Sequence, residues 1–231
     1  MLEALSTALA LLIELDSRLV EIVLLSLRVS LCAVAIAALL GLPLGAAIAV
    51  GRFPGRQTVI VFLNALMGLP PVVVGLVVYL LLSRAGPLGP LGILFTPAAM
   101  IVAQTILILP IIAALSRQAI EDAWREYEEQ LRSLGARRVN AALTLLWDTR
   151  FSLLTTILAG FGRAAAEVGA VMIVGGNIDG VTRVMTTTIA LETSKGDLPL
   201  ALGVGVVLIA IVLALNAGAM LVKEAAQRRY G

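Results

Sequence analysis

Long apolar stretches, separated by short polar segments, make up most of this chain. A helix needs about 20 predominantly apolar residues to cross the roughly 30 Å hydrocarbon core of a membrane. The predicted spans cover residues 20–50, 58–82, 97–115, 151–174 and 198–222. The pattern therefore predicts an all-α integral membrane protein with about five transmembrane helices, built as a single domain over residues 1–231.

The amino-terminal segment, residues 1–18, is apolar but short. A helix made from its apolar part would cover only about 22 Å, at about 1.5 Å per residue. Charged residues surround this part, namely Glu3, Glu14, Asp16 and Arg18. We expect an interfacial helix, and a cleaved signal peptide is the alternative, although no basic region precedes the segment.

Two adjacent prolines interrupt the second predicted span. Pro70 and Pro71 stand near its middle, and Asn64 precedes them in the same span. Proline cannot donate the amide hydrogen of a helix, so carbonyl groups freed at membrane depth need partners from protein or water. Asn64, Pro70 and Pro71 are therefore candidates for a hinge or gate that lines a passage. A proline-kinked packing helix is the alternative.

One long segment is polar, residues 117–150, with six basic and six acidic side chains. Good helix formers continue to Leu134, Gly135 favours the left-handed conformation that ends a helix, and a second helical run follows. The first helix carries an apolar stripe of Trp124, Tyr127, Leu131 and Leu134. Their spacing of three and four predicts a two-helix elbow with one apolar face. An amphipathic helix lying on the lipid surface is the alternative.

Composition supports a membrane protein and disfavours several chemistries. The chain is 60% hydrophobic and 14% charged, and it contains one cysteine and no histidine. Soluble domains are about 45–50% apolar and about 25% charged. A disulfide framework, a metal site and imidazole catalysis are therefore disfavoured. We expect no cofactor, no metal, no catalytic site and no nucleic-acid partner.

The basic residues predict the orientation, because Lys and Arg are enriched in cytoplasmic loops. If the elbow is cytoplasmic, eleven of the 17 Lys and Arg residues lie on that side and five lie outside. Five crossings then place the amino terminus outside and the carboxyl terminus in the cytoplasm. The expected location is the inner (plasma) membrane.

Arg163 and Glu167 lie inside the fourth predicted span, four residues apart and so on one helix face. A charge at membrane depth costs at least about 2.5 kcal/mol, so both side chains should face protein, water or a partner. They could pair, with each other or with a neighbouring subunit, to fix the packing. Alternatively, Arg163 could set the electrostatic potential of a passage for anions.

Hydroxyl groups cluster between the fourth and fifth predicted spans, at Thr186, Thr187 and Thr188. Such donors could bind the oxygens of a phosphate-like or molybdate-like anion. The alternative is that they bond to helix carbonyls. Nearby, Gly175 and Gly180 have the spacing of a phosphate-binding loop, but Val181 replaces the required lysine, so we expect no nucleotide site.

The elbow resembles a loop of a known transporter family. The run Glu-Gln-Leu-Arg-Ser-Leu-Gly-Ala, residues 129–136, resembles the EAA loop of ABC importer permeases. Gln130 and Leu131 replace two alanines of that pattern, and its usual Ile-x-Leu-Pro ending is absent from 145–148. In the family this loop holds a coupling helix that docks into a groove on the ATP-hydrolysing subunit. The resemblance assigns this role to Glu129, Gln130, Leu131, Ser133, Leu134, Gly135 and Ala136.

The likeness extends to the spans. The stretches 52–92 and 162–178 resemble the permeases of tungstate and molybdate importers, with sulfate importers next. The resemblance implies a type I ABC importer permease: a homodimer in membrane lipid, two ATPase subunits below, and an extracytoplasmic oxyanion-binding protein above. It also implies alternating access, with Glu129 making polar contacts to the ATPase and Gly135 permitting the turn. No complete Walker A motif occurs in the sequence, so ATP hydrolysis is expected in a separate subunit.

Two other classes stay open from the residues alone. An ion-coupled secondary carrier would need an ion site inside the chain, for which Arg163 and Glu167 are the candidates. A non-transporting membrane scaffold would need neither a hinge nor an intramembrane charge.

Overall fold

The computed structural model describes residues 17–230, so nearly all of the predicted interfacial segment 1–18 lies outside the described residues. Ser17 and Arg18 begin the first described helix. The elements, in chain order, are α2 (Ser17–Val50), α3 (Arg56–Leu66), α4 (Pro71–Leu82), η1 (Gly89–Leu91), α5 (Pro97–Ser133), α6 (Arg138–Asp148), α7 (Arg150–Ala165), α8 (Gly169–Gly175), α9 (Met185–Lys195) and α10 (Leu198–Tyr230).

The predicted all-α membrane fold is confirmed. Residues 17–230 contain no strand. Three helices, α2, α5 and α10, are long and apolar enough to cross a membrane. Two bent pairs, α3 with α4 and α7 with α8, raise the number of spans to as many as five.

Each bent pair is broken where the sequence stops supporting a helix. The α3–α4 pair bends by 98° across Met67 to Pro70, so the predicted break at the two prolines is confirmed. The α7–α8 pair bends by 59° across Ala166 to Val168, a break that we did not predict. By contrast, α5 continues through Pro110 and beyond the predicted span into the polar segment, as one helix of 37 residues.

The helices α2 and α5 form the centre of the bundle and pack along each other over most of their length. Small residues allow this close approach. A Cβ atom on Gly45 would lie 2.7 Å from the carbonyl oxygen of Ala113. Ala33, Ala37, Ile108 and Ile112 are buried in the same interface.

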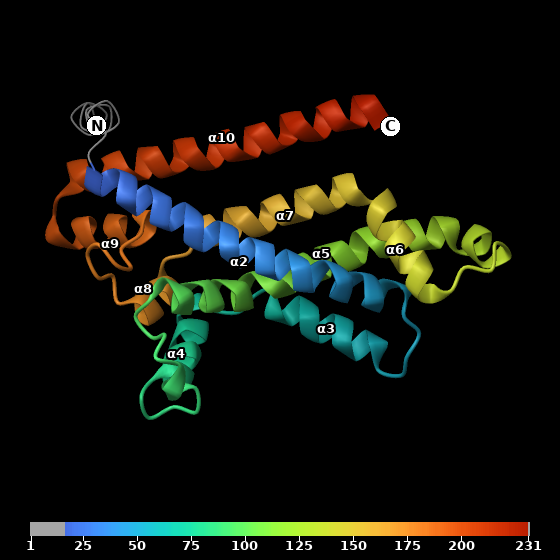
Figure 1. The fold of residues 1–231 in the computed structure, drawn as a ribbon, viewed down its shortest axis with the longest axis horizontal. Coiled ribbons are helices and arrows are strands. Elements are labelled where there is room, and N and C mark those ends of the chain that lie inside the picture. Colours follow the sequence, from blue (N-terminus) through green and yellow to red (C-terminus); the bar gives the residue numbers. More distant parts are fainter. Residues whose placement is uncertain (1–16, 231) are drawn as a thin grey trace.

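The ends of the molecule carry different elements (Figure 1). The α2–α3 turn, the α5–α6 elbow and the last turns of α10 lie at one end. The start of α2, helices α8 and α9, and the start of α10 lie at the other. Ser17 and the last turns of α10 therefore lie at opposite ends of the molecule, and the elbow lies at the same end as the last turns of α10.

Candidate coupling elbow and intramembrane site

The predicted turn of the elbow is present. Gly135 has φ +71°, the left-handed conformation that glycine adopts without strain. The amide of Ala136 donates to the carbonyl of Leu131 at 2.9 Å, and the amide of Gly135 donates to that of Arg132 at 3.0 Å. These bonds satisfy carbonyls at the end of α5 and turn the chain toward α6.

One side of the elbow is packed against the bundle. Trp124, Ala141 and Leu145 are buried in a cluster that also contains Ile120 and Leu153, and Tyr127 and Leu131 pack against it. Leu134, the last residue of the predicted apolar stripe, does not join this cluster, and its side chain is 81% exposed. Leu134 is the residue after the last turn of α5, where the chain already turns away.

The other side of the elbow is an exposed apolar ridge, which we define as Leu134, Val139, Leu143 and Trp147. The last three are spaced four residues apart on α6, so they share one face of that helix. Of the residues assigned to ATPase coupling, Glu129, Gln130 and Ser133 are also exposed, whereas Leu131 and Ala136 are half-buried. The elbow thus presents apolar and polar groups together at one end of the molecule.

Charged side chains fasten the base of the elbow to the α2–α3 turn, a contact that the sequence did not reveal. The carboxylate of Glu121 on α5 pairs with Arg56 at 3.3 Å, with Arg125 at 3.3 Å and with Arg117. Burial acts to raise the pKa of Glu121, but the hydrogen bond and positive charge of Arg56, with the charges of Arg117 and Arg125, outweigh it. The pKa of Glu121 is therefore below its ordinary value, and the group is ionised at neutral pH.

The intramembrane pair Arg163 and Glu167 forms within one chain. The Nη1 atom of Arg163 lies 2.6 Å from Oε2 of Glu167, whose side chain is 3% exposed. The other carboxylate oxygen, Oε1, accepts a hydrogen bond from the amide of Ala170 at 3.0 Å. Glu167 therefore sits in the break of the α7–α8 pair and caps the start of α8.

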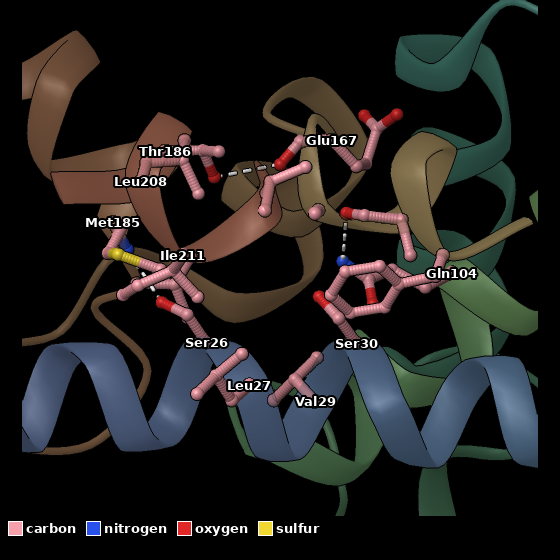
Figure 2. Close-up of a pocket in the computed structure, with 15 residues that line it drawn as sticks. Ser26, Leu27, Val29, Ser30, Gln104, Glu167, Met185, Thr186, Leu208 and Ile211 are labelled. Atoms are coloured by element: carbon pink, nitrogen blue, oxygen red, sulfur yellow. Dashed lines mark hydrogen bonds between the residues drawn. The ribbon is translucent and has the colours of Figure 1, made fainter. Parts of the chain in front are cut away.

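A small cavity adjoins this break, lined mostly by apolar side chains with a few polar ones among them (Figure 2). Ser26 and Ser30 of α2, Gln104 of α5, Glu167 and Thr186 are among its lining residues. Its volume of about 20 Å³ accommodates about one water molecule. The Oε1 atom of Gln104 has no hydrogen-bond partner among the described residues, and a water molecule would satisfy it. In this conformation the cavity is not an open passage.

The three threonines between the fourth and fifth spans donate to backbone carbonyls. Thr186 donates to Glu167 at 2.8 Å, and Thr187 and Thr188 donate to Val184 at 3.0 Å and 2.9 Å. These contacts match the alternative in which the hydroxyls bond to helix carbonyls. The bond from Thr186 also fastens α9 to the break of the α7–α8 pair.

The two bent spans meet beside their breaks. A Cβ atom on Gly75 of α4 would lie 2.8 Å from Cα of Ala170 on α8. A Cβ atom on Gly169 would lie 2.9 Å from Cγ2 of Val72. Pro71 begins α4, whereas Asn64 and Pro70 are exposed. Within residues 17–230, Arg163 and Glu167 form their ion pair with each other and not with these residues. The sequence therefore predicted the α3–α4 break, but neither the α7–α8 break nor the contact between the two spans.

The described residues form an all-helical bundle with broken spans and an exposed elbow, an architecture that suits a membrane-spanning transport subunit. The family described as binding-protein-dependent transport system inner membrane component matches residues 41–231, and the chain belongs to this family. It is therefore the permease component of an ABC transporter, a class that works with ATPase and substrate-binding partners. Membership favours this class over the secondary carrier and the scaffold.

Several relatives match most of the chain. A probable anion ABC transporter permease of Haloferax volcanii is 43% identical over 204 residues, which cover 86% of this chain and 88% of the relative. The tungstate uptake permease TupB of Peptoclostridium acidaminophilum is 41% identical over 215 residues, covering 93% and 94%. TupB of Campylobacter jejuni is 39% identical over 165 residues, covering 71% and 69%. Permeases named for sulfate and molybdenum match at lower identity.

Proposed function

We propose that this chain is the permease of a tungstate importer, and that it moves the oxyanion by alternating access while a separate subunit hydrolyses ATP. The names of two similar permeases support tungstate. The exposed apolar ridge on the elbow carries the proposal of a separate motor. An apolar ridge flanked by polar groups is typical of a surface that another protein covers.

The elbow faces the cytoplasm in this proposal. The α2–α3 turn and the end of α10 share its end of the molecule (Figure 1) and carry basic residues such as Arg52, Arg56 and Lys223. Basic residues favour the cytoplasmic side. Because Ser17 lies at the opposite end, the amino-terminal side is outside, where the oxyanion-binding protein docks, and the carboxyl terminus is cytoplasmic.

The working unit is a homodimer with two ATPase subunits. Helix α4 leaves α3 at 98° and exposes apolar side chains on the face that does not contact α8. These are Val73, Leu76, Val77 and Leu80. A second copy of the chain covers this face, and the oxyanion passes between the copies. The exposed apolar side chains of α10 contact membrane lipid.

Roles within the path follow from the contacts. Residues 67–70 form the hinge of the α3–α4 span. Asn64 lies in the last turn of α3 before the hinge, Pro70 ends the hinge, and Pro71 begins α4. The pair of Arg163 and Glu167 holds the facing break, and Arg163, whose side chain is 33% exposed, supplies positive potential toward the path. The hydroxyl of Thr186 holds α9 against the break of the α7–α8 pair, and those of Thr187 and Thr188 bond within the first turn of α9. Movement of the elbow opens or closes the contact between the two breaks.

Reconstitution tests the proposal. The permease, its ATPase and its binding protein are placed in liposomes, and ATP-dependent uptake of tungstate, molybdate and sulfate is measured. We expect tungstate uptake that needs ATP and the binding protein, with molybdate and sulfate transported less well. Uptake of sulfate in preference to tungstate would refute the assignment of tungstate as the transported anion. Uptake that persists without ATP would refute the ATP-driven mechanism.

Labelling tests the orientation. A cysteine replaces Glu129 in a variant whose native thiol is removed by Cys32→Ser, and intact cells are treated with a membrane-impermeant maleimide. We expect no labelling until the cells are opened. Labelling of intact cells would place the elbow outside and refute the docking role.

A further inference from the structure

We infer that Arg56 is a positioning residue that transmits movement of the elbow to the hinge of the α3–α4 span. The inference rests on the proposed function, because it requires the elbow to receive the ATPase. Neither the family resemblance nor the names of the relatives give a role to Arg56 or Glu121.

The guanidinium of Arg56 joins three helices. Arg56 is the first residue of α3. Its Nε atom donates to the carbonyl of Ile48 at 2.8 Å, and Nη2 donates to that of Ala49 at 3.2 Å, both in the last turn of α2. Its Nη2 atom also lies 3.3 Å from Oε1 of Glu121 on α5. A planar guanidinium can hold such a set of acceptors in fixed directions, which a lysine ammonium cannot.

Glu121 is itself held rigidly. It pairs with Arg117 and Arg125, one turn before and one turn after it on α5, as well as with Arg56. The side chains of Arg56, Arg117 and Glu121 are all mostly shielded from solvent. Water therefore screens this network less than it screens an exposed ion pair. The network fixes the start of α3 to the stem of the elbow.

The stem moves with the elbow because apolar packing joins them. Trp124, one turn after Glu121, is buried with Ala141 and Leu145 of α6 and with Leu153 of α7. A displacement of α6 therefore displaces the part of α5 that carries Glu121. Through Arg56 this displacement reaches α3, an 11-residue helix that ends at the break before Pro70. Beyond the break, α4 contacts α8 at Gly75 and Ala170.

A second ion pair in the same turn provides a matched control. Arg52 pairs with Glu128 of α5 at 2.8 Å, but its side chain is 59% exposed and donates to no helix carbonyl in the described part of the chain. Exposed ion pairs of this kind contribute little to the stability of the fold. Arg52 and Arg56 therefore carry the same charge, lie close together in the sequence and pair with the same helix, and they differ in burial and in the carbonyl contacts.

The experiment compares Arg56→Ala, Arg56→Lys, Glu121→Gln and Arg52→Ala in liposomes that contain the ATPase and the binding protein. Tungstate uptake and ATP hydrolysis are measured together. For Arg56→Ala and Glu121→Gln we expect the amount of tungstate imported per ATP to fall about fivefold or more, with stimulation of ATPase activity by the binding protein retained. The amount of tungstate imported per ATP by Arg56→Lys should lie between the values for these variants and for wild type. The value for Arg52→Ala should match that of wild type.

A second measurement follows the hinge. The single thiol of an Asn64→Cys, Cys32→Ser variant reacts with maleimide, and ATP binding should change the rate of reaction. Adding Arg56→Ala should abolish this change. If Arg56→Ala lowers uptake and hydrolysis in the same proportion, leaves both unchanged, or leaves the ATP response of position 64 intact, the inference fails. If the wild type itself imports no oxyanion, the proposed function fails instead.

Discussion

The carboxylate of Glu167 joins Arg163, 2.6 Å away on α7, to the amide of Ala170, 3.0 Å away at the start of α8. One side chain thus closes the gap in the α7–α8 span from both sides. The negative charge lies near the amino-terminal end of α8, where the helix dipole favours it. The first of the two sequence-based alternatives, pairing that fixes the packing, matches these contacts, whereas a role of Arg163 in the path stays a proposal.

Removing the carboxylate should destabilise the bundle. In Glu167→Ala, Arg163 loses its partner and the amide of Ala170 loses its acceptor, at a cost of about 2 kcal/mol. We expect a lower thermal midpoint for the detergent-solubilised protein. Glu167→Gln keeps an acceptor for the amide and should cost less. The control is Asp179→Asn, which breaks the exposed pair with Arg183 and should change the midpoint little. An unchanged midpoint in Glu167→Ala would refute the structural role.

The role of the turn at Gly135 can be tested with substitutions that differ in how well they tolerate its left-handed backbone conformation. A Cβ atom there would meet nothing within 4 Å, so a substitution acts through the backbone and not through a clash. Asparagine tolerates the left-handed conformation and valine does not. We expect Gly135→Asn to retain coupled uptake, and Gly135→Val to reach the membrane in normal amount but to separate ATP hydrolysis from uptake. Normal uptake by the valine variant would contradict the docking role of the elbow.

The exposed ridge on α6 should control assembly with the ATPase. Leu143 is exposed, and a charge at its position should be hard to desolvate in an interface. Leu143→Asp should therefore weaken association by about 2 kcal/mol or more, measured by co-purification of the ATPase. Thr144→Asp introduces the same charge one residue further along, beside the ridge, and should retain binding. An equal loss of ATPase binding in both variants would mean that added charge anywhere on α6 weakens assembly, and it would contradict a specific role of the ridge.

Local patterns in the sequence revealed the elements and the turn of the elbow, but not the contacts between elements. The capping glycine and the two prolines act on their own backbone, so Gly135 and the α3–α4 break were predictable. The network of Arg56, Glu121 and Arg117 joins segments far apart in the sequence, and an arginine in a turn gives no sign of its partner. The α7–α8 break follows a run of small residues without proline, and the bonds that Glu167 makes there to Arg163 and to the amide of Ala170 leave no signature in the sequence.

Acid should release the network at Glu121. Its pKa is below the ordinary value of 4.5, so the folded state binds the proton less well than the unfolded state. The stabilisation is present above the unfolded pKa and is lost as the pH falls through the folded pKa. The difference in thermal midpoint between wild type and Glu121→Gln should be constant from about pH 8 to about pH 6 and should shrink below about pH 4.5. A difference that disappears between pH 8 and pH 6 would contradict the assignment.

The contact between α2 and α5 at Gly45 has no room for a methyl group. A Cβ atom would lie 2.7 Å from the carbonyl oxygen of Ala113 and 2.8 Å from the amide nitrogen of Arg117, and both are backbone atoms that cannot move alone. Gly45→Ala should therefore push the two central helices apart and cost about 1–3 kcal/mol.

Gly218 on α10 provides the control, because a Cβ atom there would meet nothing within 4 Å. Alanine is the better helix former, so Gly218→Ala should be neutral or slightly stabilising. Thermal unfolding in detergent measures both variants. A contact of α10 with a second copy at this position would show as destabilisation of Gly218→Ala. Equal midpoints for Gly45→Ala and wild type would mean that α2 and α5 do not approach as closely as Gly45 permits.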